Sequence, residues 1–217
     1  ADVPGGALRG VPEYDTNDDG NAEHFLDMFS SVSTGRSVRW ADGYGWIIWH
    51  SGNTVKQPHW EKDMNGDQEV RRMWQRVKNR QIAYAEACHG DYLSELQMAL
   101  NAGLPASGAN APAALTAARA LYIKWQKVRE QSGNNRRAEN ALKAAKSFQG
   151  VAINVNDLDQ NPLLLGVENG VVELTDQVRL RRAVPEDYLT MNTNVPWEEP
   201  STHAKNLWNE YLETFLP

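Results

Sequence analysis

The sequence has little of several features that define large classes of protein. It contains a single cysteine, Cys88, so no disulfide can form within the chain, which is typical of a reducing cytoplasm. No apolar run approaches the roughly 18–20 residues that a membrane-spanning helix needs, and no secretory signal pattern opens the chain. We therefore expect a cytoplasmic protein without a membrane segment.

The sequence motifs of several catalytic classes are also missing. There is no GxxxxGK[ST] run to hold nucleotide phosphates, no GxSxG nucleophile elbow, and no convincing carboxylate cluster for divalent ions in phosphoryl transfer. The five histidines form no HxH or HExxH pair, and the closely spaced Cys/His pairs of structural zinc sites are absent. We expect a chain with no catalytic residues, no cofactor and no bound metal.

Two polar stretches resemble the first half of a calcium-binding loop. The stretch at 15–20 has Leu26 at the twelfth position, where a bidentate glutamate belongs. The stretch at 63–67 has Gln68 in place of the sixth-position glycine and Trp74 at the twelfth position. Calcium affinity depends on the number of ligands, so we expect both stretches to be polar turns that cap helix starts.

The chain nevertheless has enough apolar residues to fold. Hydrophobic residues make up 41% of its 217 positions, which suffices for one domain or two small ones. The net charge of −6 argues weakly against nucleic-acid binding. The charges are unevenly distributed, however: both ends are acidic, whereas residues 69–82 and 119–146 are basic.

Hydrophobic periodicity predicts an α+β, mainly helical fold. An N-terminal β-hairpin is expected to pack with a helix bundle, followed by a small β-hairpin module and a C-terminal helix. The expected segments are a linker over 1–16, a β-hairpin and long helix over 17–103, a helix bundle over 104–150, a small β module over 151–200, and a helix over 201–217.

The N-terminal half contains local signals for these elements. A short helix is expected over 21–32, and the Asp-Gly turn at 42–45 predicts a hairpin, since this dipeptide tolerates the positive φ of tight turns. Trp60 is placed on an edge strand because Pro58 precedes it. Alternation along 46–49 predicts a hairpin with only one buried face. A long helix over 67–102 is expected to break or kink at Gly90.

Further elements are expected after the connector at 103–113. Helical spacing predicts helices over 112–131, 135–148 and 204–216. Between the last two, Asn169-Gly170 is the strongest hairpin signal in the chain. It is expected to be followed by strand pairing of Val172 and Leu174 with Val178 and Leu180.

The same region resembles a known family. Residues 164–174 read Leu-Leu-Gly-Val-Glu-Asn-Gly-Val-Val-Glu-Leu, and residues 185–190 read Pro-Glu-Asp-Tyr-Leu-Thr. A passage much like this occurs in phage and plasmid primase–helicases, in the domain between the primase and the superfamily-three helicase. The resemblance extends more loosely back to residues 20–23 and 45–49, and therefore covers most of the chain.

The resemblance implies an accessory, non-catalytic domain of a DNA-replication protein. Such a domain would join the primase to the helicase, help to position single-stranded template DNA, and support assembly of a helicase ring or homo-oligomer. The chain begins at Ala1 and ends at Pro217 after a helical pattern, so we expect a domain excised from a longer protein. The alternative hypothesis is a protein–protein interaction or assembly module without DNA contact, and a third is a stand-alone enzyme.

The basic helices supply the candidate DNA contacts. Proteins that bind single strands combine a positive groove with aromatic stacking faces. The aromatic residues at 74, 84, 122 and 125 lie on the apolar stripes, so we expect most of them in the core, and a charged helix face is often only solvated. The candidate phosphate partners are Arg71, Arg72, Arg76, Lys78, Arg80, Lys124, Arg136 and Arg137.

Overall fold

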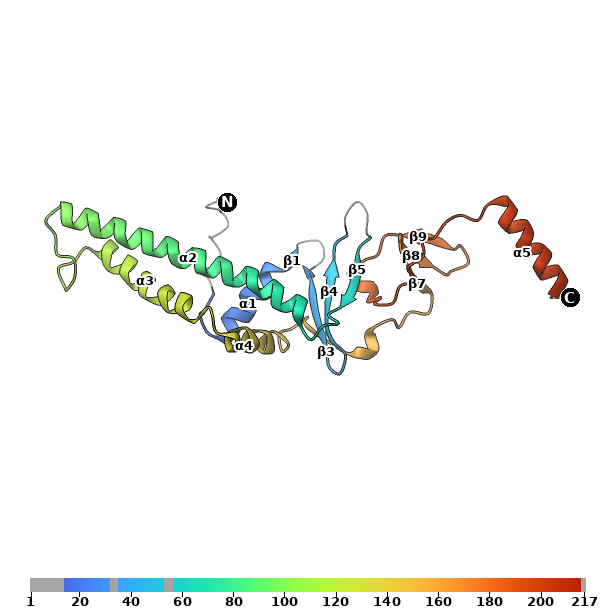
Figure 1. Cartoon of the computed structure of the whole chain (residues 1–217), viewed down its shortest axis with the longest axis horizontal. Coiled ribbons are helices and arrows are strands. Elements are labelled where there is room, and N and C mark those ends of the chain that lie inside the picture. The colour runs from blue at the N-terminus through green and yellow to red at the C-terminus, as the bar shows by residue number, and fades with distance from the viewer. Residues whose placement is uncertain (1–13, 32–34, 53–56, 216–217) are drawn as a thin grey trace. The chain divides into compact units, whose positions relative to one another are not determined.

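The computed structural model describes residues 14–31, 35–52 and 57–215, so most of the expected 1–16 linker lies outside the described residues. It confirms the predicted α+β, mainly helical fold. The chain forms two compact units (Figure 1). The first comprises residues 1–48 and 62–155, and the second comprises residues 49–61 and 156–217.

The predicted N-terminal hairpin is present. Strands β3 (Val38–Ala41) and β4 (Gly45–His50) pair antiparallel, with Trp40 opposite Trp46. Gly43 in the connecting turn and Gly45 at the start of β4 have φ of 74° and 113°, a region that favours glycine. The sheet order is β5-β4-β3-β6, so β5 (His59–Lys62) is an edge strand, as its proline predicts. Strand β6 (Ala152–Ile153) pairs parallel with β3.

The expectation that this hairpin buries only one face is wrong. Trp46 and Ile47 are fully buried, and Ile48 and Trp49 are each 6% exposed. Successive strand side chains point to opposite faces, so both faces of β4 are covered. Four consecutive large apolar residues are the pattern of a strand buried on both sides rather than on one. A separate ribbon pairs β1 (Ser30–Ser31) with β2 (Gly35–Arg36).

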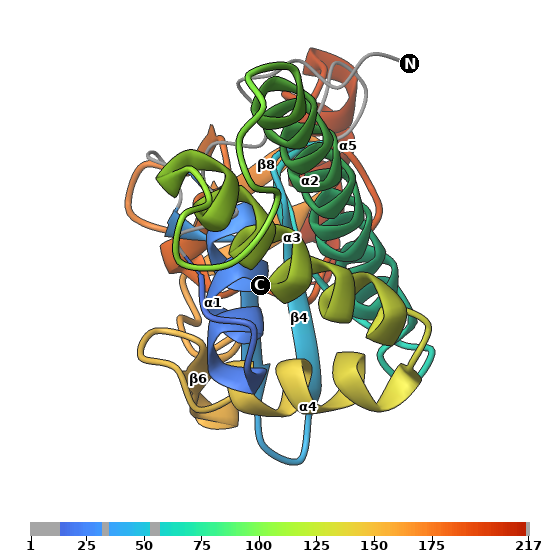
Figure 2. The ribbon, with the colours of Figure 1, turned by 90° about the vertical axis from the view of Figure 1, so that its left-hand side faces the viewer.

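Helices pack around this hairpin in the first unit. Helix α1 (Asp18–Met28) packs on α4 (Asn135–Ala145), and α1 also contacts α2 (Gln68–Asn101) (Figure 2). Their apolar faces join the strand residues in one core, which includes Phe25, Leu26, Trp46, Val70, Val77 and Leu142. Both α1 and α4 end three or four residues earlier than the spacing predicts.

The predicted break at Gly90 is absent. Helix α2 continues through it to Asn101, and α3 (Ala113–Gln131) returns along it after a connector, with Pro112 at the N-cap (Figure 1). A helical glycine costs about 1 kcal/mol relative to alanine, and packing against α3 stabilises α2 on both sides of the glycine.

A second small core holds α2 and α3 together. Ala85, Cys88, Trp125 and Val128 are buried there, and the rings of Tyr84 and Trp125 meet edge to face with centroids 4.9 Å apart. Trp125 is 1% exposed, which confirms its expected place in the core. Burial raises the pKa of the Cys88 thiol, and burial beside Cys88 raises the pKa of Tyr84 to about 12.

The second unit contains a three-stranded antiparallel sheet of order β7-β8-β9. Strands β7 (Leu164–Val167) and β8 (Gly170–Glu173) form the predicted Asn-Gly hairpin. Strand β9 (Arg179–Arg181) places Leu180 opposite Val172 as predicted, whereas Leu174 and Val178 lie outside the strands. Short 3-10 turns cover Val155–Asp157 and Pro185–Asp187.

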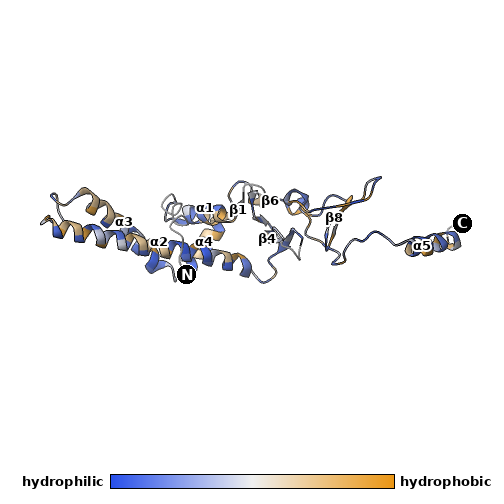
Figure 3. Ribbon diagram, turned by 90° about the horizontal axis from the view of Figure 1, so that it is seen from above, coloured by the Kyte–Doolittle hydropathy of each residue, from blue (hydrophilic) through white to orange (hydrophobic). Residues whose placement is uncertain are grey.

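The last helix, α5 (Thr202–Phe215), is amphipathic. Hydrophobic and hydrophilic residues both run along it (Figure 3). Its apolar residues Leu207, Trp208, Tyr211 and Phe215 are between 52% and 63% exposed. No helix within the described residues has the length and hydropathy to cross a membrane.

Candidate functional site

The predicted basic residues of α2 fall into two rows. Side chains four apart lie above one another on a helix, so Arg72, Arg76 and Arg80 form one row. Arg71 and Lys78, seven apart, form the other. The buried positions of α2, among them Val70, Val77 and Gln81, flank the two rows on one side of the helix. On the other side, the exposed Gln75 and Asn79 lie between the rows, so the two rows border the solvent-facing side of α2.

Two of the five basic residues on α2 form ion pairs at the surface. Arg71 lies 3.4 Å from Glu139 of α4, and Arg72 lies 2.9 Å from Glu69, one turn earlier in α2. Exposed pairs of this kind contribute about 0–1 kcal/mol. Neither ion pair therefore holds its arginine strongly.

Arg137 has a structural role that the sequence did not suggest. Its guanidinium donates to Asn21 Oδ1 at 3.0 Å, to Gln81 Oε1 at 3.5 Å and to the Val128 carbonyl at 3.3 Å. Asn21 and Gln81 are 1% and 5% exposed. These contacts tie α4 to α1, α2 and α3, and burial lowers the pKa of Arg137. We call Asn21, His24, Gln81 and Arg137 the buried polar cluster.

His24 completes this cluster. It is 1% exposed, its Nδ1 lies 3.5 Å from Gln81 Nε2, and its ring stacks on Tyr14 with centroids 4.5 Å apart. Burial, together with the positive charge of Arg80, lowers its pKa to about 4. Arg80 contributes its charge here and has a buried Nε with no hydrogen-bond partner among the described residues.

The other four predicted residues have no acidic partner in the part of the chain that the structure describes: Arg76, Lys78, Lys124 and Arg136. Arg136 lies in the first turn of α4, beside a pocket of about 270 Å³. That pocket is lined by Thr16, Asp18, Asn21, Gln131, Asn134, Arg136, Arg137 and Asn140.

Sequence reasoning missed a further basic residue. Lys146 Nζ lies 3.3 Å from the ring centre of Trp40, a cation–π geometry, and burial lowers its pKa. Lys146 and Trp40 are far apart in the sequence, and no local pattern links them.

In the second unit, the passage that resembles the primase–helicase family serves mainly as scaffold. The Asn169 side chain accepts from the Trp197 N–H and donates to the Trp197 carbonyl, both at 2.8 Å. Gly170 has φ of 151°, and a Cβ there would clash with the Arg181 carbonyl. An asparagine and a glycine are therefore required at these positions by the local geometry.

Ion pairs connect the second half of the passage to strands β8 and β9. Arg181 donates to both carboxylate oxygens of Asp187, at 2.8 and 2.6 Å, and to Glu173 at 2.6 Å. Arg179 also pairs with Glu173, and these hydrogen bonds lower the pKa of Glu173 and raise that of Arg181. The arginine and the carboxylates therefore lock β8, β9 and the following turn together.

Two further contacts fix the loops of this unit. Trp60 Nε1 donates to the Pro185 carbonyl at 2.8 Å, and its ring stacks on Tyr188. Asp159 accepts from the backbone and hydroxyl of Thr190, at 2.8 and 2.6 Å. Each polar side chain described so far in the second unit has a hydrogen-bond or ion-pair partner.

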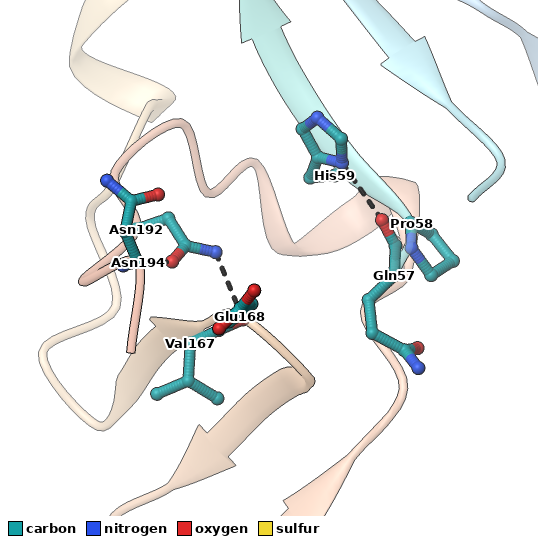
Figure 4. Close-up of a pocket in the computed structure, with 7 residues that line it drawn as sticks. All are labelled: Gln57, Pro58, His59, Val167, Glu168, Asn192 and Asn194. Atoms are coloured by element: carbon teal, nitrogen blue, oxygen red, sulfur yellow. Dashed lines mark hydrogen bonds between the residues drawn. The ribbon is translucent and has the colours of Figure 1, made fainter. Parts of the chain in front are cut away.

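Glu168 is different, because its carboxylate has no partner within the described residues. It lines a pocket of about 270 Å³ that lies entirely in the second unit (Figure 4). The other lining residues are Gln57, Pro58, His59, Val167, Asn192 and Asn194.

The two stretches that resemble calcium loops cap helices, as predicted. Asn17 Oδ1 accepts from the Gly20 N–H at 2.8 Å at the start of α1. Asp63 Oδ2 accepts from the Val70 N–H at 3.0 Å in the first turn of α2. Over the described ranges, no group of three or more His, Cys, Asp or Glu side chains is arranged to hold a metal ion.

Comparison with known proteins supports the relationship that the shared passage predicts. A family model described as "D5 N terminal like" matches residues 22–217. No curated protein matches the chain. Because the family model covers most of the sequence, the chain belongs to the D5 N-terminal-like family, the N-terminal domain of phage and viral D5-type primase–helicase proteins.

Proposed function

We propose that this domain joins the primase and helicase parts of its parent protein and contacts single-stranded template DNA through its first unit. The distribution of charge carries the proposal. The first unit has 17 basic and 16 acidic residues, whereas the second has 5 basic and 12 acidic residues. Phosphate contacts depend on Lys and Arg, so a strand is expected to bind the first unit.

The contacts proposed within the first unit differ in kind. Arg76, Lys78, Lys124 and Arg136 are the primary phosphate partners, because no described acidic side chain pairs with them. For Arg136, the positive end of the α4 dipole adds to the attraction. Arg71 and Arg72 bind phosphate only after release from their surface ion pairs. Arg80, beside the buried polar cluster, and Arg137, within it, contribute their positive charge without a direct phosphate contact.

The test is the salt dependence of binding to a labelled single-stranded oligonucleotide. Each phosphate contact on a single strand contributes about 0.7 to the slope of log K against log salt. Changing Arg76, Lys78, Lys124 and Arg136 to Gln is therefore expected to reduce the slope by about 3. The matched control changes Arg119, Lys127, Lys143 and Lys205 to Gln, which removes the same charge elsewhere. An equal loss in both variants, or no binding by the unaltered chain at low salt, refutes the proposed contact surface.

A second candidate function is supported by a separate observation. The second unit has a net charge of −7 and ends in α5, whose apolar face is exposed. These features suit a protein–protein interaction or assembly module that makes no contact with DNA. Deleting α5 from the parent is then expected to weaken assembly in sedimentation experiments without changing the salt slope. The isolated chain, given ATP, Mg²⁺ and DNA, is expected to yield neither hydrolysis nor primer.

A further inference from the structure

Hydrogen bonds hold the walls of the Glu168 pocket, and the Glu168 carboxylate has no partner among the described residues. Its two sides come from distant parts of the sequence: Gln57, Pro58 and His59 on one, and Val167, Glu168, Asn192 and Asn194 on the other (Figure 4). All seven residues belong to the second unit.

Hydrogen bonds hold the backbone around the carboxylate. The Glu168 N–H donates to the Val195 carbonyl at 3.1 Å. Asn192 Nδ2 donates to the Val167 carbonyl at 3.0 Å, and Asn192 Oδ1 accepts from the Asn194 N–H at 2.7 Å. The Glu168 side chain, in contrast, is exposed and takes no part in any hydrogen bond or ion pair among the described residues. The backbone at Glu168 is therefore held in place by hydrogen bonds in which the Glu168 carboxylate takes no part.

Contacts of His59 fix the opposite wall of the pocket. His59 Nδ1 lies 2.9 Å from the Gln57 carbonyl, so the ring donates a proton from that nitrogen. His59 Nε2 lies 3.8 Å from Glu61, whose carboxylate also lies 3.2 Å from His50. Pro58 and Val167 supply apolar surface between the polar groups.

The electrostatics favour a cationic ligand. Among the described residues that line the pocket there is no Lys or Arg, and the unit as a whole carries a net charge of −7. A phosphate or other anion would therefore approach the Glu168 carboxylate with no described Lys or Arg beside it. A positively charged group would instead gain charge-assisted hydrogen bonds, which are roughly twice as strong as neutral ones.

The chemistry of the lining favours arginine over other cations. A guanidinium is planar, weakly hydrated and able to bind a carboxylate with two parallel N–H groups, while its methylene stem covers apolar surface such as Pro58 and Val167. The volume of about 270 Å³ lies below the roughly 300–1,000 Å³ of pockets that enclose drug-sized ligands. It suits a single side chain.

We propose that the Glu168 pocket accepts an arginine side chain presented by a neighbouring protein surface. This inference rests on the proposed joining role, because it names the chemistry by which the second unit contacts a neighbour. It is independent of any contact between the first unit and DNA.

The test is a titration of the full chain with N-acetyl-arginine amide, followed by backbone amide NMR signals. Shifts are expected at Glu168, Asn194 and His59. Glu168→Gln keeps the side-chain shape and removes the charge, and it is expected to weaken binding by about tenfold, the difference between a charged and a neutral hydrogen bond. Glu186→Gln is the matched control, because Glu186 is exposed in the same unit and lies outside the pocket.

Four results would overturn the proposal. The first three are that arginine amide leaves the pocket signals unmoved, that Glu168→Gln binds as tightly as the unaltered chain, and that N-acetyl-lysine amide binds equally well. The fourth concerns cytidine, a third probe with no charge and no phosphate: shifts from it that exceed those from arginine amide would make this a nucleobase site. None of these probes contains phosphate, so failure here leaves the DNA salt slope of the first unit as a separate result.

Discussion

Replacing Arg137 tests whether the buried polar cluster holds the helices of the first unit together. Arg137 and Arg136 are adjacent in α4 and have the same charge, yet only Arg137 donates to buried side chains. We therefore compare Arg137→Met with Arg136→Met. Methionine retains much of the apolar stem, so the substitution removes chiefly the hydrogen bonds and the charge.

The expected magnitude follows from the groups left behind. Gln81 Oε1 loses the donor at 3.5 Å, and the Val128 carbonyl loses a donor at 3.3 Å. Asn21 Oδ1 loses one donor and keeps Gln81 Nε2 at 2.9 Å. A buried polar group without a partner costs about 1–3 kcal/mol, so Arg137→Met is expected to lower the free energy of unfolding by about 2–4 kcal/mol. A surface change such as Arg136→Met costs less than about 0.5 kcal/mol.

The assay is urea denaturation followed by tryptophan fluorescence. For small domains the slope is about 1–3 kcal/mol per molar urea, so the midpoint of Arg137→Met is expected to fall by roughly 1–2 M. A double-mutant cycle with Gln81→Met then measures the coupling, expected at about 0.5–3 kcal/mol for residues in one network. Equal midpoints for the two arginine variants, or zero coupling with Gln81, would refute the structural role.

Two further predictions concern charge in the cores of the two units. Burial lowers the pKa of His24 to about 4 from 6.5. The stability associated with the neutral ring is therefore fully present above pH 6.5 and is lost as the pH falls toward 4. Between pH 7 and pH 5 the free energy of unfolding is expected to fall by about 2 kcal/mol; His24→Gln should flatten this dependence in urea titrations, and exposed His203→Gln should not. In the second unit, Asp187→Asn replaces the carboxylate that binds Arg181 through two oxygens. Faster amide exchange over β8 and β9 is expected, with a loss of about 1–3 kcal/mol, while Glu186→Gln should exchange at the unaltered rate; identical rates for both variants would contradict the ion-pair account.

Local turn and cap chemistry is what sequence reasoning predicted well. Asn169-Gly170 forms its hairpin because these residues tolerate the backbone angles of a tight turn, and the turn at 42–45 succeeds for the same reason. The prediction of a break at Gly90 was wrong. The cost of a glycine in a helix, about 1 kcal/mol, is smaller than the stabilisation that α2 gains from packing against α3. The single buried face expected for 46–49 failed because cover on both sides comes from residues distant in the sequence.

The candidate sites also combine features that the sequence predicts with features that it does not. The basic residues could be counted along the chain, but their partners could not, since Arg137 binds side chains 116 and 56 positions away. The Glu168 pocket likewise needs residues 57–59 beside 167–194.

By itself, the sequence determined the fold class, the turns, the family and the uneven distribution of charge, because each of these depends on neighbouring residues or on composition. Only the tertiary structure decided which arginines have buried partners, that the Glu168 carboxylate lines a pocket, and that residues 49–61 belong with 156–217. The physical reason is that burial and pairing depend on which distant segments meet, and that contact is formed only when the chain folds.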